Sequence, residues 1–169
     1  MAHKFSFCFS VFLLLTISCF GQEAADLIEK GQREVQNGEY EAALIEFNKA
    51  IDADAEYLDA YVQRAFVYSM LKDYEKAIID YTKLIELNPN FATAYLSRGS
   101  AFNKLELFDK ALVDFDKVII LDPLNSEAYN NRGWSKKGLG DKDGACSDWK
   151  TSKKMGNGEA KIILKNNQC

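Results

Sequence analysis

Histidine is almost absent from this sequence of 169 residues, because His3 is the only one. A catalytic triad, a His-activated cysteine, a His-ligated metal and a histidine pH switch all depend on an imidazole that titrates near neutral pH. The sequence also has no glycine-rich phosphate loop after a predicted strand and no complete calcium loop. We therefore expect a protein that is not an enzyme, has no catalytic residue and needs no cofactor, metal or small-molecule substrate.

Proline is scarce as well, with two residues, and neither sign of charge dominates. The hydrophobic fraction of 47% and the charged fraction of 27% are ordinary for a globular protein, which excludes a disordered tail, a collagen-like fibre and a polytopic membrane protein. The net charge of -4 argues against nucleic acid as a partner, since such binding requires an excess of Lys and Arg. One soluble domain is the expectation.

The first 21 residues have the pattern of a signal peptide. Lys4 precedes an apolar stretch from Phe5 to Phe20, which is too short and too serine-rich for a membrane-spanning helix. Cleavage after Gly21 leaves Gln22 first, and the mature chain is then exported to a periplasmic or extracellular location. Lipid attachment at Cys19, giving a membrane-anchored lipoprotein, is the weaker alternative because Thr16 stands where an aliphatic residue is usual. Membrane association is expected only in that case.

A repeat of 34 residues runs through the rest of the chain. Aligning the chain at this period gives three full columns, one of small residues, one of alanine and one of aromatic residues. The columns are Gly31, Ala65, Gly99 and Gly133; Ala43, Ala77, Ala111 and Ala145; and Phe47, Tyr81, Phe115 and Trp149. An aromatic column of Tyr40, Tyr74 and Phe108 breaks at Lys142, and Pro89 and Pro123 share a column with Ala55 and Asn157. Such regularity predicts a repeat protein.

Each repeat contains two helical patterns separated by a turn. In residues 58–91, apolar side chains recur at three-to-four spacing on both sides of Lys72 and Asp73, and Pro89 then ends the second pattern. Antiparallel helices approach closely only where side chains are small, so the glycine and alanine columns mark helix contacts and the aromatic column fills the space beside them. A single hairpin leaves an apolar face exposed, which predicts that hairpins stack on one another.

These columns resemble the tetratricopeptide repeat family, in which a small residue, an alanine, an aromatic residue and a proline recur every 34 residues. The resemblance implies an all-α fold, an α-solenoid of four helical hairpins with a C-terminal capping helix. Residues 22–169 form this domain, with repeats at 24–57, 58–91, 92–125 and 126–159 and the cap at 159–167. The segment from Asp141 to Cys169 is also similar to the closing unit of exported bacterial members of the family.

The resemblance further implies a concave groove that is lined by the first helix of each hairpin and binds peptides or partner proteins. The groove candidates are residues outside the packing columns: Gln63, Phe66, Leu96, Ser100, Asn103, Asn130, Asn131, Trp134 and Lys137. Phe66 and Trp134 stand out, since an exposed aromatic side chain is typical of a binding hot spot. Packing of Trp134 against Lys137 and solvated asparagines are the alternatives.

One binding mode of the family is not expected. Members that clamp the C-terminal carboxylates of cytosolic chaperones use cationic groove positions, and here those positions hold Ile28, Gln32, Gln63, Thr93 and Ser97. We therefore expect an interaction module for another peptide or protein segment. The alternative is a structural assembly subunit of an envelope complex or oligomer, suggested by a net charge of -9 over residues 22–125 and of +4 over residues 126–169.

Two of the four cysteines, Cys146 and Cys169, remain after the predicted signal peptide. If a helix from Lys142 to Lys154 is followed by an antiparallel cap, both cysteines lie at similar distances from the turn, and an oxidising compartment permits a disulfide. One buried thiol and one frayed terminal thiol is the alternative.

Overall fold

The computed structural model describes residues 6–169, with side chains from Gln22 onward. Within these residues the chain forms nine α-helices and no strand. The predicted signal peptide begins in residues 1–5, which lie outside the described part, and residues 6–21 form the start of the first helix. None of the helices in the described part combines the length and the apolar character needed to cross a bilayer. The predicted all-α fold is confirmed. The chain divides into two compact units, residues 1–71 and 72–169.

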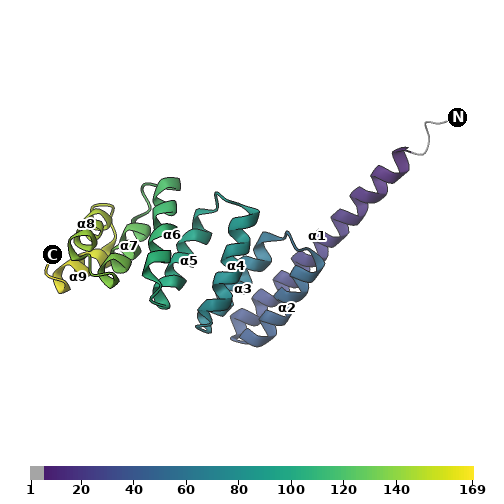
Figure 1. The fold of residues 1–169 in the computed structure, drawn as a ribbon. Coiled ribbons are helices and arrows are strands. Elements are labelled where there is room, and N and C mark those ends of the chain that lie inside the picture. Colours follow the sequence, from purple (N-terminus) through teal and green to yellow (C-terminus); the bar gives the residue numbers. More distant parts are fainter. Residues whose placement is uncertain (1–5) are drawn as a thin grey trace. The chain divides into compact units, whose positions relative to one another are not determined.

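The first unit contains three helices: α1 (Ser6–Asn37), α2 (Tyr40–Ala53) and α3 (Leu58–Met70). The N-terminal part of α1 projects beyond the residues that pack against α2 (Figure 1). The core includes Ile28, Phe47 and Val67, one from each helix, together with buried alanines. Gly31 gives α1 and α2 their close contact, because a Cβ atom at this position would overlap the ring of Phe47.

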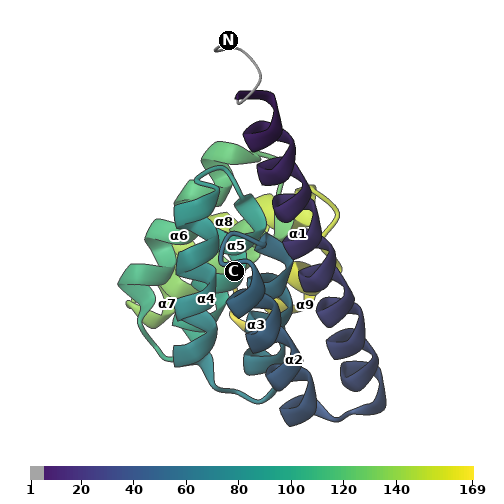
Figure 2. The ribbon, with the colours of Figure 1, turned by 90° about the vertical axis from the view of Figure 1, so that its right-hand side faces the viewer.

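The second unit contains six helices: α4 (Tyr74–Leu87), α5 (Ala92–Lys104), α6 (Phe108–Leu121), α7 (Ser126–Gly138), α8 (Lys142–Lys154) and α9 (Gly158–Asn166). Each helix packs on the one that precedes it in this unit, and α5 also contacts α7 (Figures 1 and 2). The two glycines of the small-residue column in this unit, Gly99 and Gly133, lie against the rings of Phe115 and Trp149. The columns found in the sequence are therefore helix-to-helix contacts.

The turns within the hairpins repeat in the same way. Residues 38, 72, 106 and 140 all have a positive φ, between 58° and 86°, although only the first and last are glycine. Side chains of Asp73, Asn125, Asp141 and Asn157 cap the helices that follow them by accepting hydrogen bonds from free backbone N–H groups. Local turn chemistry therefore helps to set where α4, α7, α8 and α9 begin.

Candidate functional site

A pocket of about 530 Å³ is lined by residues of α5 and α7 and by the first residue of α6 in the second unit. The residues that line it are Ser100, Asn103, Lys104, Phe108, Asn131, Trp134, Lys137 and Gly138. Gly138 admits the ring of Phe108, which reaches across from the first residue of α6, because a Cβ atom at position 138 would lie about 2.5 Å from that ring. The pocket thus combines two aromatic rings with amide, hydroxyl and ammonium groups.

Trp134 is the largest exposed side chain of the pocket, with 39% of its surface accessible. Its ring meets the buried ring of Trp149 edge to face, with centroids 5.2 Å apart and planes 64° apart. The ammonium of Lys137 lies 4.9 Å from the Trp134 ring centroid. These contacts fix the orientation of the indole while leaving one side of it open, as a preformed apolar anchor requires.

A network of polar side chains joins α5 to α7 beneath the pocket. Asn103 Nδ2 donates to the carbonyl of Asn131 at 3.1 Å, and Asn131 Nδ2 donates to Ser100 Oγ at 3.3 Å. The hydroxyl of Ser135, which is fully buried, donates to Asn103 Oδ1 at 2.7 Å. Most of the hydrogen-bonding capacity of these groups is used within the chain, which makes the pocket wall rigid.

The pocket contains five of the nine residues predicted for the groove: Ser100, Asn103, Asn131, Trp134 and Lys137. Leu96 is half-buried and does not line it. Asn130 is 3% exposed, and its carbonyl accepts a hydrogen bond from the Trp149 indole at 3.1 Å, so it faces the interior. Gln63 and Phe66 lie on α3 of the first unit, where Phe66 is 47% exposed.

The tetratricopeptide repeat model matches residues 58–91. The solved structure of the first TPR of Spaghetti (RPAP3) bound to HSP90 peptide SRMEEVD is 32% identical, has a TM-score of 0.67 and covers 71% of this chain and 95% of its own. The chain belongs to the tetratricopeptide repeat family.

Two further TPR structures extend the comparison. The first TPR domain of human RPAP3 is 31% identical over 73% of this chain and 97% of its own, with a TM-score of 0.65. MamA from Desulfovibrio magneticus RS-1, at 20% identity and a TM-score of 0.77, covers 81% of this chain and 77% of its own and shares the fold. No curated protein matches the sequence.

The sequence analysis missed Lys104, Phe108 and Gly138 as members of the TPR pocket. The signal for Phe108 was present, since it belongs to the aromatic column that breaks at Lys142. All three residues flank the turns that end α5 and α7, where helical periodicity no longer tells which way a side chain points. Within the described residues, no group of three or more Cys, His, Asp or Glu side chains is placed to hold a metal ion.

A second missed feature is a pair of charged columns at the same 34-residue period. Lys30, Arg64, Arg98 and Arg132 form one column, and Glu46, Asp80, Asp114 and Asp148 form the other. Arg98 Nε and Nη2 donate to the two carboxylate oxygens of Asp114 at 2.9 and 2.8 Å, and Arg132 makes the same paired contact with Asp148 at 2.8 and 2.7 Å. Asp114 and Asp148 are 2% and 4% exposed, so one ion pair with a buried carboxylate joins α5 to α6 and another joins α7 to α8 in this TPR protein.

Each of these arginines also reaches the preceding hairpin. Arg98 Nη1 donates to Thr82 Oγ1 of α4 at 3.0 Å, and Arg132 Nη1 donates to Asp116 of α6 at 2.6 Å. Hydrogen bonds to Asp114 raise the pKa of the Arg98 guanidinium, and those to Asp148 and Asp116 raise the pKa of Arg132. Both groups therefore stay charged at any pH at which the protein is folded.

Glu46 is the corresponding carboxylate of the first unit, and it predicts how acid affects stability. Hydrogen bonds from Lys30 and Lys49, at 2.9 and 3.0 Å to one oxygen, lower the pKa of Glu46 from its ordinary 4.5. A lowered folded pKa gives stability that is present above the unfolded value and lost as pH falls through the folded one.

We therefore expect Glu46→Gln to lose less unfolding free energy than the unaltered protein when pH is lowered from neutral to below 4.5. Urea unfolding at several pH values measures this difference. Glu41→Gln, an exposed position on the same helix, should keep the pH dependence of the unaltered protein. Equal pH slopes for both variants would contradict the assignment.

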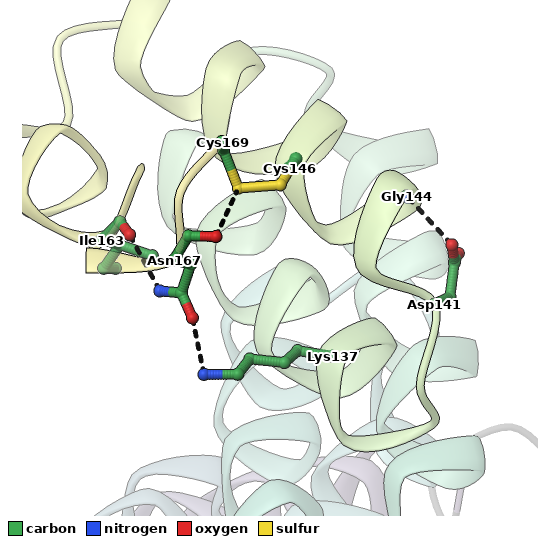
Figure 3. The surroundings of a disulfide bond; sticks show 7 residues. All are labelled: Lys137, Asp141, Gly144, Cys146, Ile163, Asn167 and Cys169. Carbon is green, nitrogen blue, oxygen red and sulfur yellow. Dashed lines mark hydrogen bonds between the residues drawn. A yellow bond between two sulfur atoms is a disulfide. The ribbon is translucent and has the colours of Figure 1, made fainter. Parts of the chain in front are cut away.

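A disulfide joins Cys146 of α8 to Cys169 after α9, with Cα atoms 5.5 Å apart (Figure 3). Asn167 lies beside it, donates to the carbonyl of Ile163 at 2.8 Å and accepts from Lys137 Nζ at 2.6 Å. The bridge and this amide together hold α9 against α7 and α8.

Removing the bridge should lower the unfolding free energy by about 3 kcal/mol, since it closes a loop with a sequence separation of 23. The double variant Cys146→Ser with Cys169→Ser, unfolded in urea, provides the measurement. The unaltered protein in reductant should shift to the same midpoint, and a reductant-insensitive midpoint would show that the bridge does not form.

Proposed function

We propose that this protein is a non-enzymatic interaction module whose pocket on α5 and α7 binds an extended peptide segment of a partner protein. The observation that carries the proposal is the open face of Trp134, held in place by Trp149 and Lys137 within a pocket that also contains Phe108. The related TPR of Spaghetti (RPAP3), which was solved with a bound peptide, supports it. An exposed aromatic residue in a rigid, partly apolar pocket is the usual centre of a binding hot spot.

The polar residues of the pocket indicate the peptide's chemistry. Lys104 is exposed at the end of α5, and Lys137 lies beside the Trp134 ring. An apolar or aromatic side chain would contact Trp134 and Phe108, and a nearby carboxylate would pair with the two ammonium groups. We infer a peptide in which an apolar residue is followed or preceded by an acidic one.

This chain lacks the residues of a clamp for chaperone C-termini. The positions where a clamp needs cations hold uncharged residues, namely Ile28, Gln32, Gln63, Thr93 and Ser97. The HSP90 peptide SRMEEVD of the RPAP3 structure also has an apolar residue next to an acidic one, but this chain lacks the cations that a clamp needs for a C-terminal carboxylate. Its binding should be weak compared with that of a peptide selected on the pocket itself.

The test uses short peptides selected from a random display library and then titrated in solution, with tryptophan fluorescence as the signal. Trp134→Ala should weaken binding about thirtyfold, the value for a hot-spot residue of about 2 kcal/mol. Val113→Ala is the matched control, because Val113 is 68% exposed on α6 but does not line the pocket. Equal affinities of the two variants would remove the pocket from consideration. Because Trp134→Ala removes a tryptophan that contributes to the fluorescence signal, the affinities of both variants are compared by displacement of a labelled tracer peptide.

We also propose that the protein is exported. The apolar segment from Phe5 to Phe20 and the cysteine pair Cys146 and Cys169 support this, since disulfides persist in oxidising compartments. The mass of the protein isolated from its own cell is the test. Loss of residues 1–21 is expected, a lipid adduct on Cys19 would indicate the lipoprotein alternative, and an intact N-terminus would reject both.

The alternative function is a structural assembly subunit, and one observation favours it. Val113 and Ile120, seven residues apart on α6, are 68% and 73% exposed, and Leu124 in the turn after α6 is 78% exposed. Exposed apolar patches on soluble proteins often mark contacts with other proteins. Sedimentation of the protein and of a variant with serine at these three positions separates the functions. The assembly function is favoured if the unaltered protein forms an oligomer, the variant is a monomer, and the unaltered protein does not bind peptides.

A further inference from the structure

A second hollow, of about 550 Å³, lies between α8 and α9 and is surrounded by lysines. Five lysines line it, three from α8 and two from α9: Lys150, Lys153, Lys154, Lys161 and Lys165. All five are exposed, and none forms an ion pair with another residue in the part of the chain that the structure describes. Among the described residues, no Asp or Glu side chain lines the hollow. Five like charges gathered here repel one another, a cost that an anionic ligand would remove.

Helix electrostatics explains only some of these lysines. Lys153 and Lys154 in the last turn of α8 and Lys165 in the last turn of α9 favour the negative ends of their helices. Lys161 is the fourth residue of α9, near its positive N-terminal end, where a cation is unfavourable. Lys150 lies before the last turn of α8 and gains nothing from the helix end. Fold stability therefore does not account for the full set.

The surroundings of the lysines are apolar. Leu164 and Cys169 form part of the lining, and the disulfide from Cys169 to Cys146 fixes α9 against α8. Ile162, next to Lys161 in α9, is 63% exposed. A soluble polyanion or an acidic peptide would explain the lysines but leave Ile162 in water. A lipid surface takes both kinds of side chain, with cations at the level of the phosphates and aliphatic groups below them.

We propose that this lysine hollow is a docking site for an anionic phospholipid surface. The distribution of charge within the second unit supports this, since residues 72–125 carry a net charge of -2 and residues 126–169 a net charge of +4. An anionic membrane attracts the lysines of α8 and α9 and repels the acidic part of the chain. Because charges are screened beyond about 8 Å at physiological salt, only the lysine end senses the surface strongly.

The experiment measures binding of the full-length protein to phosphatidylglycerol-containing vesicles relative to pure phosphatidylcholine vesicles. The ratio is the readout because the apolar segment of residues 5–20 can bind lipid of either charge. The unaltered protein should prefer the anionic vesicles, and high salt should abolish the preference. Replacing Lys154, Lys161 and Lys165 with glutamine should reduce the ratio on the order of a hundredfold, at about 1 kcal/mol per lysine.

The control variant replaces three exposed lysines that do not line the hollow, Lys72, Lys110 and Lys142, with glutamine. It changes the net charge of the protein by the same amount. It should keep the preference. Equal ratios for the two triple variants would overturn the proposal, as would a salt-insensitive ratio for the unaltered protein.

Two further ligands separate a lipid surface from other anions. Ile162→Gln should lower vesicle binding severalfold and leave binding of inorganic polyphosphate unchanged. Binding of polyphosphate without a vesicle preference would show a site for soluble phosphate, and binding of polyglutamate without it would show a site for acidic protein. Either result would overturn the proposal.

Discussion

Replacing Trp149 with alanine should lower the unfolding free energy by about 3–5 kcal/mol, the usual cost of removing a large buried aromatic side chain. Trp149 is 1% exposed and packs with Ala145 and Ile163. It lies against Gly133, which has no side chain to move into the space left behind. The carbonyl of Asn130 also loses the indole N–H that it accepts from at 3.1 Å. Urea unfolding monitored by the helical circular dichroism signal gives the value.

Trp134→Ala is the matched control for this prediction. Trp134 is 39% exposed and gives up mainly its edge-to-face contact with Trp149, for which about 0.5–1.5 kcal/mol is expected. The two tryptophans of the chain thus separate stability from binding, since one supports the fold and the other is proposed to bind peptide. A smaller loss for Trp149→Ala than for Trp134→Ala would contradict the packing described here.

Asp114→Asn should lower the unfolding free energy by about 3 kcal/mol. Removing one partner of a buried ion pair typically costs about 3–5 kcal/mol, because the other charge remains without compensation. The side chain of Asp114 is 3% exposed, whereas that of Arg98 is 18% exposed and keeps its hydrogen bond to Thr82, which places the cost at the lower end. Thermal and urea unfolding both report the loss.

Asp116→Asn offers a control on the same helix. Its carboxylate also pairs with an arginine, Arg132, at 2.6 Å, but its side chain is 56% exposed, so a loss of at most about 1 kcal/mol is expected. Replacing Arg98 with methionine and Asp114 with leucine together should recover most of the stability, since no buried charge remains. Similar losses for Asp114→Asn and Asp116→Asn would mean that burial does not decide the effect.

The sequence predicted the hairpins because their contacts are periodic. Small residues at Gly31, Gly99 and Gly133 recur opposite aromatic residues, and the structure places each glycine against the ring sixteen positions later. The family and the helical class followed from the same spacing, whereas the sequence left open whether Cys146 and Cys169 pair or remain free thiols. Contacts that repeat along the chain are therefore readable from one sequence.

The pocket was predicted less completely because it depends on helix phase. Successive residues of a helix point about 100° apart, so Asn130 faces the interior while Asn131 lines the pocket. The buried ion pairs were missed for another reason. Charged side chains usually indicate a solvated face, and only the packing of α5 on α6 brings Arg98 to the buried carboxylate of Asp114.

The double role of Arg98 and Arg132 determines how the second unit should come apart. Each guanidinium bonds to its own hairpin and to the one before it, so detaching a hairpin would strip an arginine of one set of acceptors while the other set stays in place. In repeat arrays, such neighbour contacts are the source of cooperativity. Residues 72–169 should therefore melt in a single concerted transition, without a long-lived species that has lost one hairpin.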